Sequence, residues 1–319
     1  MRLSTSLAIA ALLALPACQS MPAFSPSAAP TDVTTWRHAV AHIRPPSAGC
    51  FTASVPSMEW TPIACSTAPT LRSHRIGNGN DYFANVGPHV ISVAEGSFLR
   101  VAGLRSVRSQ RSGKGWSGLN AYSLQLNTQF FATSSCARIA HCAGWVQFVY
   151  QNPPNGAGSL QIWDWLVSTT SANLSGCPPR RGWQYSFGDC VQTSPKSVSV
   201  PNQPITGLPE MNIVGQAASD GDSITFGTGG TQYAIRNAQS DDVADLSAHW
   251  QGAEFNVFAP GNGATATFNA GTTINVNLEM QDGSLDAPAC SGDAGTTAES
   301  NSLSFVKAPV STHLPAYPS

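Results

Sequence analysis

The sequence predicts an all-β protein, and three observations support that prediction. Only 11% of the residues are charged, and 28 glycines and 23 prolines favour turns over long helices. Apolar and polar residues alternate with a period of two in several short segments, which is the pattern of a half-buried strand. Asn-Gly, Asp-Gly and Gly-Gly turns separate these segments. A chain of 319 residues is long enough for one large β domain with a sizeable core.

The first 18 residues have the features of an export signal. Arg2 provides a positive charge, and residues 7–15 form an apolar stretch too short to span a bilayer as a helix. The stretch LPAC at residues 15–18 resembles a bacterial lipobox, in which Cys18 would be lipidated and become the mature N-terminus. The alternative is ordinary signal cleavage near that point, with Cys18 left as a spare thiol.

Either pathway predicts an exported protein. Several acyl chains on Cys18 would anchor the protein firmly to a membrane. Gln19, where an Asp would favour the inner membrane, makes a bacterial outer-membrane lipoprotein the expected form, and a periplasmic or secreted protein is the alternative.

Residues 19–46 are rich in Ala, Pro, Ser and Thr, which predicts a tether between the membrane and a folded domain at residues 47–319 with a polar C-terminal tail. His38 and His42 in this tether stand four residues apart and could share a helical face. Without an adjacent Glu or a third ligand, such a pair is more often found at a surface than at a metal site. We therefore expect no metal and no cofactor.

The formal charge of −2 gives the protein no strongly basic surface, so nucleic acid is not an expected partner. Six of the eight cysteines stand in three close pairs, and in an oxidising compartment the simplest pairing joins neighbours, although sequence cannot fix connectivity. Cys290 is left unpaired or bridged in another pattern, and no CxxC spacing suggests structural zinc. The expected disulfides are Cys50–Cys65, Cys136–Cys142 and Cys177–Cys190.

Residues 121–131, AYSLQLNTQFF, have the clearest strand pattern in the chain. Leu124 and Leu126 fall on one side, and the amides of Gln125, Asn127 and Gln129 fall on the other. The segment is therefore expected to form a half-buried strand whose polar face is lined with amides.

Two further segments, at residues 144–151 and 159–167, are expected to form a hairpin around an NPPNG turn. They contain Trp145, Trp163 and Trp165, with Gln147 between them. Strands rich in Trp and amides can form a core, a sugar-binding platform or a peptide cleft, of which a core is the most common.

Glu254 lies within strand-forming residues, in the segment AEFNVF at residues 253–258. On a strand, Glu254 shares one face with Asn256 and Phe258, while the other face is apolar. A face with an acid, an amide and an aromatic ring is typical of a substrate-lining sheet. A solvated face with a chance Glu is the more common explanation of a lone strand carboxylate.

These segments together resemble the eqolisin family of glutamic peptidases. LQLNTQF at residues 124–130 resembles the strand of the catalytic Gln, WVQF at 145–148 resembles an aromatic W-Y-E-W strand, and AEFNVF at 253–258 resembles the strand of the catalytic Glu. The similarity keeps this order between about residues 96 and 280. The departures are Asn127 where the family has Gly, Gln147 where it has Glu, and a missing second acid in the Glu strand.

The resemblance implies a concanavalin-like (jelly-roll) β-sandwich of two antiparallel sheets, and an exported, monomeric endopeptidase acting in acid on peptide or protein substrates. Glu254 would be the general base and then the general acid on water, and Gln125 would stabilise the oxyanion. Neprosin-type peptidases, which use a pair of Glu, are more distantly similar, but only Glu279 offers a second strand Glu. The expected substrate-binding residues are Asn127, Gln129, Trp145, Gln147, Trp163, Trp165 and Asn256.

Other chemistry fits the sequence less well. It contains neither a G-x-S-x-G elbow nor H-E-x-x-H, and Asp164 with Glu254 is the only carboxylate pair that could suit a glycosidase. The rival hypothesis is a non-catalytic surface lipoprotein that binds glycan or protein through a Trp-bearing sheet face. Convergence of Gln125 and Glu254 would favour the peptidase, and exposed tryptophans would favour the binding protein.

Overall fold

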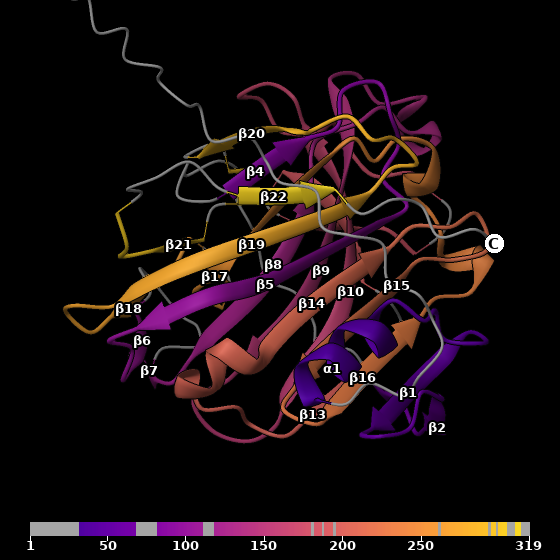
Figure 1. The fold of residues 1–319 in the computed structure, drawn as a ribbon. Coiled ribbons are helices and arrows are strands. Elements are labelled where there is room, and N and C mark those ends of the chain that lie inside the picture. The colour runs from indigo at the N-terminus through magenta and orange to yellow at the C-terminus, as the bar shows by residue number, and fades with distance from the viewer. Residues whose placement is uncertain are drawn as a thin grey trace, which may run out of the picture.

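The computed structural model describes residues 32–67, 82–110, 118–179, 182–186, 188–193, 196–260, 263–292, 295–297, 299–304 and 310–313. The export signal and Cys18 lie outside these residues. Within them the all-β fold class is confirmed: strands dominate, and the helical elements are short (Figure 1). These are the α-helix α1 (Val33–Ala41) and the 3₁₀ helices η1 (Ser134–Cys136), η2 (Ile205–Glu210), η3 (Gln239–Asp241) and η4 (Leu246–Ala248).

Two large sheets form a sandwich, and the described pairings within them are antiparallel except for β19 with β22. The eight-stranded sheet runs β2 (Thr61–Ile63), β1 (Gly49–Ser54), β16 (Thr231–Arg236), β15 (Ser223–Thr228), β14 (Met211–Gln216), β5 (Val93–Ala102), β19 (Thr273–Gln281), β22 (Val310–His313). The ten-stranded sheet runs β11 (Gln184–Ser186), β12 (Asp189–Thr193), β10 (Gly158–Ser168), β9 (Cys142–Asn152), β8 (Tyr122–Thr128), β17 (Gly252–Phe258), β4 (Tyr82–Asn85), β20 (Ala289–Gly292), with β13 (Lys196–Val200) beside β10 and β3 (Ser66–Thr67).

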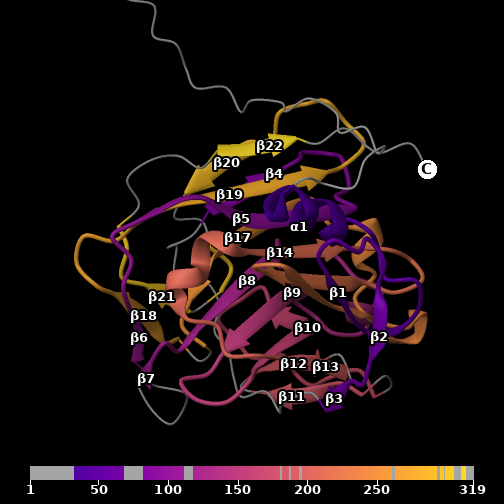
Figure 2. The same ribbon diagram turned by 60° about the horizontal axis from the view of Figure 1, so that its bottom comes forward.

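A smaller sheet lies at one end of the sandwich (Figure 2). It runs β21 (Ser300–Asn301), β18 (Thr265–Phe268), β6 (Val107–Gln110), β7 (Gly118–Leu119), with β18 and β21 parallel. The sandwich is thus the observed architecture, while its assignment to the concanavalin-like type remains a prediction from the resemblance.

The core lies between the two large sheets. Ile213 and Ile224 of the eight-stranded sheet and Phe148 and Phe255 of the ten-stranded sheet belong to one buried apolar cluster. A Cβ atom on Gly96 of β5 would lie 2.2 Å from the ring of Phe255, so only glycine allows the sheets to approach this closely here. Because side chains alternate along strands, the residues between these core positions point to the outer faces of the sandwich.

The predicted tether is wrong for its second half, because α1 belongs to the folded domain. Asp32 caps the helix by accepting a hydrogen bond from the backbone N–H of Thr35 at 2.9 Å. Trp36 and Val40, one helical turn apart, are fully buried and share an apolar cluster with Phe51 of β1. Figure 1 shows α1 lying over the eight-stranded sheet. The composition of this segment is typical of a linker. The spacing of Trp36 and Val40, however, gives it one apolar face, which packs on the sheet as a helix.

The structure contains the three expected disulfides, Cys50–Cys65, Cys136–Cys142 and Cys177–Cys190, and Cys290 takes part in none of them. Three disulfides indicate an oxidising location, extracellular or periplasmic. No helix among the described residues has the length and apolar character needed to cross a membrane.

If α1 is part of the fold, replacing its buried tryptophan should destabilise the whole domain. We expect Trp36→Ala to lower the free energy of unfolding by about 3–5 kcal/mol, since it leaves a large cavity. Val33→Ala, at an exposed position of the same helix, should change it by less than about 0.5 kcal/mol. Urea unfolding monitored by circular dichroism measures both, and equal stability of the two variants would restore the tether interpretation.

Candidate functional site

The predicted catalytic residues lie on neighbouring strands of the ten-stranded sheet. In the antiparallel ladder of β8 and β17, Asn256 stands opposite Gln125 and Glu254 stands opposite Asn127. Directly opposed residues point to the same face. Because Phe255 and Leu126 of these strands face the core, all four polar side chains lie on the outer face.

Glu254 has no solvent exposure, and both of its carboxylate oxygens accept hydrogen bonds. Asn127 Nδ2 donates to Oε1 at 3.2 Å. The backbone N–H of Thr296 donates to Oε2 at 2.5 Å, and the Thr296 hydroxyl donates to the same oxygen. Asn127 also links the carboxylate to the Gln125 side chain, whose Oε1 accepts from Asn127 Nδ2 at 3.4 Å.

Trp165 sets the direction of this hydrogen-bond network, because an indole N–H can only donate. It donates to Gln147 Oε1 at 2.8 Å, which turns Gln147 Nε2 toward Gln125 Oε1 and Asn127 Oδ1, each at 3.1 Å. Gln125 then directs its own nitrogen to the hydroxyl of Ser123, at 3.1 Å. Asn127, rather than Gln125, is therefore the amide that donates to Glu254.

Most of the predicted site residues are brought to this face of the sheet. Trp145 donates to the backbone oxygen of Thr128 and to the hydroxyl of Thr296, at 3.0 and 3.1 Å. Trp163 packs with Trp145 and Trp165 in one buried cluster. Asn256 lies on the same face, and its Oδ1 accepts from the backbone N–H of Val257.

Gln129 is the exception among the predicted substrate-binding residues. Its Nε2 donates to the backbone oxygen of His249 at 2.6 Å, and its Oε1 accepts from the backbone N–H groups of Gln251 and Gly252. Because β8 ends at Thr128, Gln129 leaves the strand pattern and holds the loop before β17 instead. It makes no hydrogen bond to Glu254 among the described residues, so it stands apart from the network, and its assignment to a substrate-binding set stays a prediction.

The alternative of an exposed tryptophan platform does not fit this structure. Trp145, Trp163 and Trp165 are 0%, 5% and 1% exposed, so their rings form core rather than a binding surface. Asp164 points to the opposite side of the sheet from Glu254, because it stands opposite the core residue Val146 in the β9–β10 ladder. A glycosidase pair of Asp164 and Glu254 is therefore excluded by the sheet between them.

Sequence reasoning missed Thr296, the residue in closest contact with the Glu254 carboxylate. It lies between β20 and β21, in the part of the chain expected to be a polar tail. Contact between residues 42 positions apart leaves no local pattern. The only available signal was its composition, since consecutive threonines at 296 and 297 supply hydroxyl donors.

No family model matches this sequence, and no curated protein matches it either.

The hydrogen-bond network predicts that replacing Trp165 destabilises the protein more than replacing Trp183 does. Trp165→Phe removes the indole N–H that donates to the buried Oε1 of Gln147 and should lower the free energy of unfolding by about 1–3 kcal/mol more than Trp183→Phe. Trp183 is the control for removal of an indole N–H, because its own has no acceptor among the described residues, although its half-buried ring also loses less packing. Urea denaturation of both variants tests this, and equal losses would mean that the Trp165 hydrogen bond does not stabilise the network.

Proposed function

We propose that this protein is an exported, acid-acting endopeptidase that uses Glu254 as general base and then general acid, with Gln125 as a stabiliser of the oxyanion. The observation that carries the proposal is the convergence of Glu254, Asn127 and Gln125 on one sheet face in a single hydrogen-bond network. Its peptide or protein substrate belongs to the same proposal, as do monomeric action and attachment to the outer membrane through a lipid on Cys18.

The surroundings of Glu254 suit the activation of water. The Thr296 hydroxyl, which donates to Oε2, occupies the position that a nucleophilic water would take once this segment moved. Such a water would give its proton to Glu254 as its oxygen attacks the scissile carbonyl carbon. The protonated Glu254 would then return that proton to the leaving amine as the C–N bond breaks, which regenerates the carboxylate.

The developing negative charge needs a donor. Gln125 Nε2 uses one N–H on Ser123, and its second N–H has no acceptor among the described residues. In the proposed mechanism this second N–H binds the oxyanion. Asn127 uses its amide on Gln125 and on Glu254, so its role is to hold the carboxylate in place.

Access to Glu254 requires a movement of the chain at Thr296, since the carboxylate is fully buried. Thr296 is itself 8% exposed and donates two hydrogen bonds to Glu254. In the proposal this contact holds the protein in a closed, inactive arrangement, and substrate replaces it. A non-catalytic binding protein lacks support because the tryptophans that would form its platform are buried.

Cleavage of an unfolded protein by the full chain tests the proposal, over a range from about pH 2 to about pH 7. We expect cleavage in acid that Glu254→Gln abolishes, because an amide cannot accept the proton of water. Gln125→Ala should lower kcat by about 10²–10³ through loss of an oxyanion donor. Glu59→Gln, at an exposed position, is the control and should keep full activity.

Circular dichroism must show that all of these variants fold. If the folded wild type cleaves nothing at any pH, the protein is not a peptidase. If Gln125→Ala keeps its full turnover, the role assigned to Gln125 is wrong.

The closed arrangement makes a separate prediction. Thr296→Val keeps the side-chain shape but removes the hydroxyl that donates to Glu254. A hydrogen bond to a charged group is worth about 1.5–3 kcal/mol. Its loss should make the closed arrangement easier to open, so kcat/KM should rise about tenfold or more. Thr273→Val, at an exposed position of β19, should leave it unchanged. Steady-state cleavage of a peptide measures both variants, and a fall in the activity of Thr296→Val would make Thr296 part of the active site rather than its cover.

A further inference from the structure

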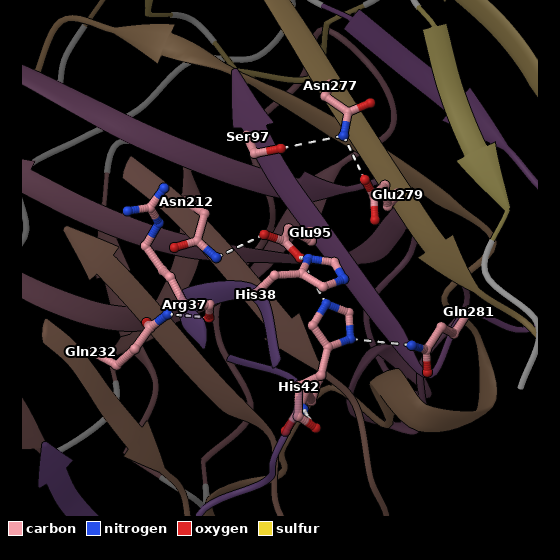
Figure 3. Close-up of polar contacts among 11 residues, drawn as sticks. Arg37, His38, His42, Glu95, Ser97, Asn212, Gln232, Asn277, Glu279 and Gln281 are labelled. Carbon is pink, nitrogen blue, oxygen red and sulfur yellow. Dashed lines mark hydrogen bonds and ion pairs between the residues drawn. The ribbon is translucent and has the colours of Figure 1, made fainter. Parts of the chain in front are cut away.

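A second polar cluster lies on the other side of the sandwich, where α1 covers the eight-stranded sheet (Figure 3). His38 lies in the last turn of α1 and His42 is the C-cap residue, so the two, four residues apart, lie on one side of the helix. Both rings point to the Glu95 side chain on β5, which lies on the outer face of the sheet and is 3% exposed (Figure 3). Neither imidazole belongs to a solvated tether, contrary to the expectation from sequence.

The three side chains converge on one point. His38 Nδ1 lies 2.8 Å from Glu95 Oε2, and His42 Nε2 lies 2.7 Å from the same oxygen. The three atoms that could bind a metal all lie within 4.8 Å of one another. The second oxygen of Glu95 accepts a hydrogen bond from Asn212 Nδ2 at 2.7 Å, so the carboxylate presents one oxygen to both rings.

We propose that His38, His42 and Glu95 bind a divalent transition-metal ion of the zinc type, which fastens α1 to the eight-stranded sheet. Two imidazoles and one carboxylate form a donor set that zinc takes in proteins. Bonds of about 2.0–2.1 Å in a tetrahedral site separate the ligand atoms by about 3.3 Å. Each ring nitrogen would therefore move about 0.5 Å away from Glu95 Oε2, and the two ring nitrogens, now within 4.8 Å of each other, would take the same spacing.

The residues around the cluster suit a metal site. Gln281 lies 3.1 Å from His42 Nδ1, and a half-turn of its amide would place its oxygen on the proton of that nitrogen, a contact that orients metal-binding imidazoles. Glu279 stands opposite Glu95 in the β5–β19 ladder, and its Oε1 accepts from Asn277 Nδ2 at 2.7 Å. Glu279 is thus a second carboxyl group beside the site, and Glu279 or water would complete the coordination.

The competing explanation is an ion pair without a metal. Burial opposes protonation of His38, but the Glu95 carboxylate outweighs it and raises the pKa of His38 to about 9. Zinc would have to displace that proton. His38 has a side chain that is 34% exposed, so an ion can reach the cluster from solvent, and direct measurement of binding separates the two explanations.

Isothermal titration of the full chain with zinc chloride, after removal of metal by a chelator, tests the proposal. We expect one zinc ion per chain, and His42→Gln should weaken binding at least tenfold. His89→Gln is the matched control, because His89 is partly exposed and lies near only Asp286 among the described carboxylates. This control should bind zinc as the wild type does.

Because removal of an imidazole could disturb α1 itself, the isosteric variant Glu95→Gln is measured as well, with folding checked by circular dichroism. Zinc at about 100 times its Kd should raise the Tm of the wild type by several degrees and leave that of Glu95→Gln unchanged. Failure of the wild type to bind zinc, or equal affinity in the wild type and both variants, would overturn the proposal. Neither result depends on peptidase activity.

Discussion

The structure depends on a carboxylate that is fully buried on an outer sheet face. Burying a charged group costs several kcal/mol unless hydrogen bonds replace its water. Glu254 receives these bonds from Asn127 and from Thr296, which come from two distant parts of the chain. Asn127 must also be oriented so that its nitrogen faces Glu254. Gln147 orients Asn127 by donating to its oxygen, and the indole of Trp165 orients Gln147 in the same way. One buried carboxyl group thus orients side chains across four neighbouring strands.

Strand faces and disulfides could be predicted because their causes are local. The alternation around Gln125 assigns each side chain to a face, and the same rule assigns Glu254 to a face of β17, while the register that sets Glu254 opposite Asn127 comes from the structure. Gln129 shows where the rule ends, since it continues the alternation in sequence but lies beyond the end of β8. The burial of the tryptophans agrees with the most common role of such strands.

What could not be predicted depends on contacts between distant segments. Thr296 reaches Glu254, and His38 and His42 meet Glu95, without a local pattern that joins them. In the sequence, the two histidines stand one helical turn apart with no adjacent carboxylate. Glu95 of β5 comes next to them only after folding. The composition of residues 19–46 concealed α1, because the apolar helical spacing is confined to nine residues in a segment otherwise rich in Ala, Pro, Ser and Thr.

The two outer faces share a design in which a segment near one end of the chain covers a buried carboxylate. The segment at Thr296 does so over Glu254, and α1 does so over Glu95. The difference lies in the donors, since hydroxyl, backbone and amide groups surround Glu254, whereas imidazoles face Glu95. In our proposals, the first set leaves the carboxylate suited to proton transfer, and the second provides ligands for a metal ion.

The claim that Glu254 activates water is tested most directly by single-turnover cleavage in ¹⁸O-labelled water, followed by mass spectrometry of the product and of the enzyme. General-base catalysis predicts that the label enters only the new carboxyl terminus of the product. Label in the Glu254 side chain would mean that this carboxylate attacks the substrate itself. A folded chain that releases no product would contradict the peptidase proposal altogether.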